Sequence, residues 1–301
     1  MKFLFEHKLQ INPTSDSLSS RITNLLYSLQ RFLALALIPF LLTSCASHEA
    51  RQKSANMVAE HSGFTPHVIK AGAFWLQTYQ KVQNPGLPYT IYIEGDGFAF
   101  KNRWEISEDP TPKRSMVLEL ATHDYRSNII YIARPCQYEA INMDHYCNNS
   151  YWTTKRMSDE VVNSINVAIK TLTHNQPVDI IGYSGGGGVA VLVAERNKQI
   201  RSIITIAGNL DHVAFNQYHK VRPMIGSLNP IDVATKVRHI PQVHYTGGED
   251  KIVPAFIADK FVQTANSPCV RQAILPNVSH DSGWDKSWNY ILSTPVTCEK
   301  K

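Results

Sequence analysis

Short apolar runs alternate with stretches of helical periodicity from Phe64 onward. Several of the runs are continuous in Ile and Val, which is typical of strands buried on both faces of a parallel sheet. The expected strands are 64–71, 74–82, 89–94, 128–134, 178–183, 202–207, 242–247 and 271–277. The expected helices between and after them include 158–173, 187–198 and 254–265. This alternation predicts a doubly wound α/β fold with an eight-stranded, mostly parallel sheet flanked by helices, and functional groups at the carboxyl ends of the strands.

The longest interruption of this pattern covers residues 209–241. Its position after a central strand predicts a small lid over the site. The remainder of 63–301 has the length of one domain.

The N-terminal segment carries a different pattern. Residues 32–42 form an apolar run preceded by Arg31, too short to span a bilayer but of the length of a signal-peptide core. The run leads into Leu42-Thr43-Ser44-Cys45, which resembles the lipobox of bacterial lipoproteins. The resemblance implies a signal peptide over 1–44, a lipid anchor of palmitate-type acyl chains on Cys45 and a location in the bacterial cell envelope, facing the periplasm or exterior. The polar residues after Cys45, up to 62, are expected to form a tether, and the alternative is a cysteine placed there by chance.

The bulk composition is that of a globular protein. The 301 residues are 43% hydrophobic and 18% charged, with a net charge of +5. Lys and Arg are scattered and form no basic block, which argues against a nucleic-acid partner. The expected partners are an acyl substrate, either a small molecule or a lipid, and the membrane through the anchor.

The cysteine count fits an exported protein. With Cys45 lipidated, the other four cysteines form two local pairs, Cys136 with Cys147 and Cys269 with Cys298. An even remainder suits disulfides in an oxidising compartment, and none of the cysteines has zinc-ligand spacing. We therefore expect these two disulfide bonds and neither a metal nor an organic cofactor.

The strand over 178–183 ends in Gly182-Tyr183-Ser184-Gly185-Gly186. This G-x-S-x-G sequence stands between a buried strand and a helix, where a sharp turn exposes the serine hydroxyl. Ser184 is the candidate nucleophile. A serine needs a base held by an acid, and both follow downstream in the chain.

The two downstream candidates each follow an expected strand. Asp250 follows 242–247 within Gly247-Gly248-Glu249-Asp250, and His280 follows the last strand. The order Ser, Asp, His matches a nucleophile, acid and base placed at three strand ends. Glu249 is the neighbouring alternative to Asp250 as the acid.

The oxyanion hole has two expected sources. One donor is the backbone N–H of Gly185, directly after the nucleophile. The second comes from the loop after the strand 89–94, where Asp96 is favoured and Gly97 is next.

Residues 64–292, with the three motifs Gly182-Tyr183-Ser184-Gly185-Gly186, Asp250 and His280, resemble the α/β-hydrolase superfamily. The resemblance implies a serine hydrolase that works through an acyl-enzyme, commonly on esters, thioesters or amides. Among these we expect carboxylic esters, as for an esterase or lipase. A peptidase or amidase of the same fold is the alternative among enzymes. The fold hosts many chemistries, so it does not by itself identify the substrate.

Two other classes remain. A loose G-x-G-x-x-A at 185–190 suggests a dinucleotide site, but such a site belongs at the first strand of a sheet. A catalytically silent, membrane-tethered binding protein is the second, and reaction with a fluorophosphonate probe would discriminate it from an enzyme.

Overall fold

The computed structural model describes residues 48–299. The expected signal peptide over 1–44 and the expected lipidation site Cys45 lie outside the described residues. The described residues from 50 onward form one compact unit.

An eight-stranded sheet organises the described residues. Its spatial order is β1-β2-β4-β3-β5-β6-β7-β8. The strands are β1 (Thr65–Ala71), β2 (Phe74–Val82), β3 (Tyr89–Ile93), β4 (Asn128–Ile132), β5 (Val178–Tyr183), β6 (Ile200–Ile206), β7 (Gln242–Gly247) and β8 (Val270–Leu275). β2 runs antiparallel to its two neighbours, and every pairing from β4 to β8 is parallel. The predicted eight-stranded, mostly parallel sheet is confirmed, with each strand boundary within two residues of its expected place.

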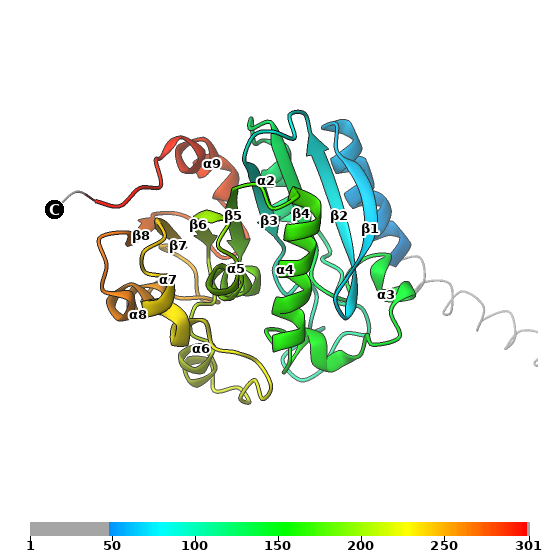
Figure 1. Ribbon diagram of the computed structural model, residues 1–301. Coiled ribbons are helices and arrows are strands. Elements are labelled where there is room, and N and C mark those ends of the chain that lie inside the picture. Colours follow the sequence, from blue (N-terminus) through cyan, green and yellow to red (C-terminus); the bar gives the residue numbers. More distant parts are fainter. Residues whose placement is uncertain (1–47, 300–301) are drawn as a thin grey trace, which may run out of the picture. The chain divides into compact units, whose positions relative to one another are not determined.

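Helices cover both faces of this sheet. They are α2 (Met116–Thr122), α3 (Ala140–Met143), α4 (Asp159–Thr173), α5 (Gly185–Arg196), α6 (His212–His219), α7 (Ala234–Val237), α8 (Phe256–Ala265) and α9 (Trp284–Ser293), with the short 3-10 helices η1 (Asn149–Trp152) and η2 (Pro230–Val233). α4, α5, α7 and α8 share one hydrophobic core with the sheet, and α2 and α9 share the other. Figure 1 shows α4 and α5 in front of the strands. None of the helices in residues 48–299 is long and apolar enough to cross a membrane.

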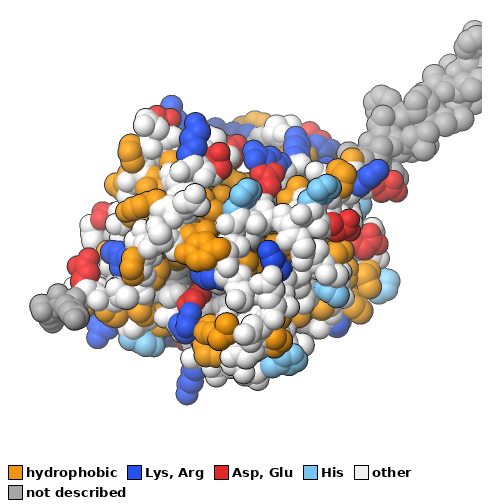
Figure 2. Space-filling view, turned by 90° about the horizontal axis from the view of Figure 1, so that it is seen from above, with side chains coloured by type: hydrophobic (Ala, Val, Ile, Leu, Met, Phe, Trp, Pro, Cys, Tyr) orange, Lys and Arg blue, Asp and Glu red, His pale blue; other side chains and the backbone are white. Residues whose placement is uncertain are grey.

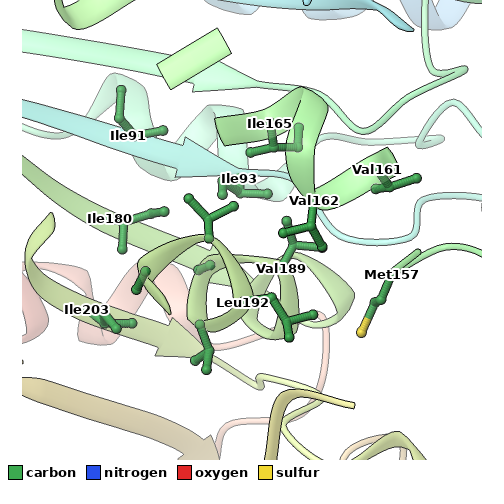
Figure 3. Close-up of a cluster of buried hydrophobic side chains, with 14 of the residues drawn as sticks. Ile91, Ile93, Met157, Val161, Val162, Ile165, Ile180, Val189, Leu192 and Ile203 are labelled. Atoms are coloured by element: carbon green, nitrogen blue, oxygen red, sulfur yellow. The ribbon is translucent and has the colours of Figure 1, made fainter. Parts of the chain in front are cut away.

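The larger core lies where α4 and α5 meet the central strands. Figure 3 shows side chains of α4 and α5 in one buried cluster with Ile91, Ile93, Ile180 and Ile203 of the sheet. The helix residues are Val161, Val162 and Ile165 of α4 and Val189 and Leu192 of α5. All of these side chains are buried. Close packing of this kind holds the start of α5 in place, and Ser184 lies at that point.

The segment expected as a tether is different in the structure. Residues 50–61 are helical, and Ala55 and Ala59 are buried against the sheet. The Gln52 amide donates to the Tyr79 hydroxyl at 3.1 Å, and that hydroxyl donates to Asn56 at 2.8 Å. The compact unit therefore begins at residue 50 instead of residue 63, and the expectation of a tether through residue 62 is wrong for this part. The physical reason is that Ala55 and Ala59 lie one turn apart on the same face of the helix, so this face can pack closely against the sheet. The polar side chains of Gln52 and Asn56 form hydrogen bonds with Tyr79.

The region 209–241, expected as a lid, contains α6, η2 and α7. The end of α6 contacts two loops: His219 Nε2 lies 2.7 Å from the carbonyl of Ile252, and Arg103 donates to the His219 carbonyl at 3.4 Å. α6 thus lies beside the loop that follows β7, and its role as a lid stays a prediction.

Both expected disulfide bonds are present, Cys136–Cys147 and Cys269–Cys298. The first fixes the loop after β4, and the second joins the start of β8 to the segment after α9.

On the face shown in Figure 2, basic side chains are interspersed with hydrophobic, polar and acidic ones.

Candidate active site

Ser184 occupies a sharp turn between β5 and α5. Its φ of 51° and ψ of −120° place a non-glycine residue in a strained region of backbone space. The glycines around it permit close backbone contacts: a β-carbon on Gly182 would overlap the backbone of Gly186, and one on Gly186 would overlap the backbone of Glu94. The turn that G-x-S-x-G predicts is therefore the turn in the structure, with its serine half-buried.

The structure brings Ser184, His280 and Asp250 together in hydrogen-bonding order. His280 Nε2 lies 3.2 Å from Ser184 Oγ, and His280 Nδ1 lies 2.9 Å from Asp250 Oδ2. Ser184 can donate its proton to Nε2 only when the proton of the neutral ring is on Nδ1, and the bond to Asp250 favours that tautomer. A serine, a base and an acid in this relation form an activated nucleophile.

Asp250 is held by the backbone of its own loop. Its Oδ1 accepts hydrogen bonds from the backbone N–H groups of Ile252 and Val253, each at 2.8 Å, while Oδ2 faces the histidine. Asp250 is buried, whereas Glu249 is exposed. The geometry therefore favours Asp250 over its neighbour as the acid.

Two aromatic side chains fix the histidine loop. The Tyr183 hydroxyl and the Trp284 indole N–H both donate to the carbonyl oxygen of His280, at 3.1 and 3.0 Å. Burial raises the pKa of Tyr183 well above its ordinary value, so its hydroxyl keeps the proton that it donates. The imidazole is thus oriented by contacts from β5 and from the first residue of α9.

The loop after β3 lies against the nucleophile. The carboxylate of Asp96 lies so close to Gly185 that a β-carbon on Gly185 would overlap it, and Gly97 has a φ of +65°. None of the described residues accepts a hydrogen bond from the backbone N–H of Asp96 or of Gly185. The N–H groups of Gly185 and Asp96 stay the predicted donors of an oxyanion hole.

Two arginines neutralise the Asp96 carboxylate. Arg134 Nη1 lies 3.2 Å from one carboxylate oxygen, and Arg156 Nε lies 3.2 Å from the other. Arg134 is only 3% exposed, and burial lowers the pKa of its guanidinium. An unpaired carboxylate here would repel negative charge developing on a substrate oxygen, so the pair of cations makes the site compatible with an oxyanion.

Glu94 holds the loop after β3 in place through hydrogen bonds. The buried carboxylate accepts hydrogen bonds from the Ser115 hydroxyl at 2.5 Å, the Tyr131 hydroxyl at 2.7 Å and the backbone N–H of Gly95 at 2.9 Å. Burial raises the pKa of Glu94, and these three donors oppose the shift. The loop is therefore fixed at Glu94 by hydrogen bonds and at Asp96 by ion pairs with the two arginines.

Sequence reasoning did not single out Glu94 as an anchor, nor Arg134 or Arg156. Arg134 was expected as the last residue of a strand, but β4 ends at Ile132 and Arg134 belongs to the loop that follows. A charged residue directly after a run of buried apolar residues at the catalytic edge is the signal that could have found it. Among residues 48–299, no group of His, Cys, Asp and Glu side chains could hold a metal ion.

Comparisons with known proteins agree with this architecture. No protein-family model matches the chain, and no curated protein sequence matches it significantly. Solved structures are similar to it: an acylaminoacyl peptidase of Pyrococcus horikoshii (TM-score 0.55, 12% identity, 79% of this chain and 42% of that chain) and a Pyrococcus furiosus esterase (0.55, 14%, 77% and 90%). A puromycin-hydrolyzing peptidase of Mycobacterium tuberculosis is similar with a TM-score of 0.55, 12% identity and coverage of 77% of this chain and 38% of that chain. The chain thus spans less than half the length of the two peptidases. The sheet order, the placement of the three site residues at strand ends and these neighbours together establish that the chain has the α/β-hydrolase fold.

Proposed function

We propose that this protein is a serine hydrolase that acts through a covalent acyl-enzyme. The observation that carries the proposal is the unbroken hydrogen-bond chain from Ser184 through His280 to Asp250. Such a chain raises the nucleophilicity of a serine that would otherwise be inert.

The reaction follows from the positions of these groups. His280 Nε2 takes the proton of Ser184 as Oγ forms a bond to the substrate carbonyl carbon. The carbonyl π electrons move to its oxygen, which accepts hydrogen bonds from the N–H groups of Gly185 and Asp96. When the tetrahedral intermediate collapses, the imidazolium protonates the leaving group, and the acyl group stays on Ser184. A water molecule, deprotonated by His280, then attacks the acyl carbon and releases the acid.

Carboxylic esters are the proposed substrate class, as for an esterase or lipase. The Pyrococcus furiosus esterase is matched over 90% of its length, whereas the two peptidases are matched over 42% and 38% of theirs. An amide substrate would make the protein a peptidase or amidase with the same triad. A panel of aryl esters and anilides of matched acyl groups separates the two, and turnover of anilides with no turnover of esters would reverse the assignment.

We further propose that the protein is lipid-anchored in the bacterial cell envelope through Cys45. The apolar run 32–42 and the lipobox-like residues before Cys45 support this proposal. The two disulfide bonds are also expected of an oxidising compartment outside the cytoplasm. Fractionation of the producing cells tests it, and recovery of the unprocessed chain in the cytoplasm would contradict it.

A further inference from the structure

Arg156 brings a positive charge close to the nucleophile through one intervening carboxylate. Its buried Nε lies 3.2 Å from Asp96 Oδ2. The other oxygen of Asp96 lies against Gly185, since a β-carbon on Gly185 would stand 2.0 Å from it. Gly185 directly follows Ser184. A single carboxylate group therefore separates the Arg156 guanidinium from the residue after the nucleophile.

The two arginines that pair with Asp96 use their terminal nitrogens differently. Arg134 Nη1 donates to Asp96, and Arg134 Nη2 donates to the carbonyl oxygen of Arg156. Arg156 forms its ion pair through Nε alone, and neither of its terminal nitrogens donates a hydrogen bond to any of residues 48–299. Its side chain keeps 11% exposure, so these nitrogens can be reached from outside the protein.

This arrangement is unusual among the largely buried arginines of the described part of the chain. Each of the others donates a hydrogen bond from at least one terminal nitrogen. These arginines are Arg51, Arg126, Arg134 and Arg196. Polar groups at buried positions normally have partners, so the two free nitrogens of Arg156 call for a ligand.

The charges of this cluster leave one positive charge in excess. Arg134 and Arg156 are both cationic, and Asp96 is the one carboxylate that pairs with them. Glu94 also acts on Arg134, but burial raises the pKa of Glu94, and it forms no ion pair with a described residue. The cluster therefore suits a ligand that carries a single negative charge.

The neighbouring start of α6 does not supply that charge. Burial lowers the pKa of the His212 ring and the charge of Arg156 lowers it further, against a hydrogen bond with the backbone of Ser227. The ring is therefore neutral near pH 7. Asp211, which precedes it, is already paired with Lys260 at 2.7 Å. Neither residue occupies the free nitrogens of Arg156.

We propose that Arg156 binds a carboxylate of the substrate, so that the favoured esters carry one negative charge. This substrate class rests on the proposed function. The two terminal nitrogens of a guanidinium hold parallel donors that match the two oxygens of a carboxylate. A phosphate monoester carries about −1.5 to −2 charges at neutral pH, which exceeds the single positive charge available and meets repulsion from Asp96.

The carboxylate can belong to the acyl chain or to the leaving group, and steady-state hydrolysis of matched ester pairs tests both. The first arm uses para-nitrophenyl hemiesters of succinate, glutarate and adipate, each against the neutral ester with a methyl group in place of the carboxylate. The second uses the butyrate esters of para-hydroxybenzoate and of para-cresol. In one of the arms, the wild type should prefer a carboxylate ester by at least about tenfold in kcat/KM, equivalent to about 1.4 kcal/mol.

Variants of Arg156 separate binding from support of Asp96. Arg156→Met should bring this preference to within about twofold of unity, mainly by raising KM for the carboxylate ester. A purely structural role would instead lower turnover of both esters equally and leave the preference unchanged. Arg156→Lys keeps the charge without the paired donors and should retain part of the preference. Lys155→Met is the matched control: it removes a neighbouring charge whose Nζ lies 5.8 Å from the centre of the Tyr151 ring, and it should keep the wild-type preference.

Calorimetric titration of Ser184→Ala with the same esters measures binding without turnover. Tighter binding of the carboxylate ester, lost in Ser184→Ala/Arg156→Met, would support the inference even if the hydrolase assignment failed. Melting temperatures show that each variant is folded. Equal kcat/KM for charged and neutral esters in every pair, or an unchanged preference in Arg156→Met, would overturn the inference and leave the hydrolase assignment standing.

Discussion

Replacing Asp250 by Asn tests the role of the acid. The substitution keeps the size of the side chain, and its carbonyl oxygen can still accept the two backbone hydrogen bonds from Ile252 and Val253. That arrangement turns the amide NH₂ toward His280 Nδ1. The ring must then accept at Nδ1 and carry its proton on Nε2, which faces Ser184 Oγ. A protonated Nε2 cannot take the serine proton, and the amide cannot stabilise the imidazolium.

The expected loss is large. Wrong-tautomer variants of this kind lose on the order of 10⁴ in kcat, equivalent to about 5.5 kcal/mol of activation free energy. Glu249→Gln is the matched control, because it makes the same chemical change one residue away on an exposed side chain. Its turnover should stay within about twofold of wild type, since substitutions of exposed residues usually change stability by no more than about 0.5 kcal/mol.

The assay is steady-state hydrolysis of an aryl ester, with the melting temperature of each variant measured alongside. Asp250→Asn should lower kcat without a large loss of stability, because the backbone contacts of the loop are kept. If Glu249→Gln were the slower variant, the acid would be Glu249 and the hydrogen bond between His280 and Asp250 would not describe the working enzyme.

Three further predictions concern the framework and the anchor. Selective reduction of the Cys269–Cys298 bridge should lower stability by about 3 to 4 kcal/mol in the chain-entropy account and should lower activity by loosening the histidine loop; full activity after verified reduction would break that link. Arg134→Met should destabilise the protein by about 1.5–3 kcal/mol in urea unfolding, because it leaves the half-buried Asp96 carboxylate with Arg156 as its remaining partner. The surface variant Arg201→Met should change stability by less than about 1 kcal/mol, and equal effects would refute the distinction. Cys45→Ser should abolish incorporation of labelled palmitate and release the protein from membranes, and equal labelling of the variant would refute the lipid anchor.

The fold could be predicted because the pattern of the strands is strong. Strands such as 178–183 are buried on both faces, so they read as continuous apolar runs bounded by turns. The site could be predicted for a related reason: Ser184, Asp250 and His280 each follow a strand directly. In a parallel sheet these ends meet at one edge, so motifs far apart in the chain are brought together.

The remaining features lacked such a signal. The helical segment 50–61 buries only small residues such as Ala55 and Ala59, and its sequence is otherwise polar, so it reads as an exposed linker. The ion pairs of Asp96 with Arg134 and Arg156 join three loops. No periodicity specifies how loops approach one another, because their positions depend on tertiary packing.

The central claim is that Ser184 is an activated nucleophile, and the most direct test is labelling with a fluorophosphonate probe followed by peptide mapping. The probe should modify Ser184 alone in the wild type and leave Ser184→Ala unmodified. Ester turnover of that variant should fall by on the order of 10⁴ to 10⁶ with the melting temperature retained. Labelling at another residue, or turnover by Ser184→Ala at the wild-type rate, would contradict the account.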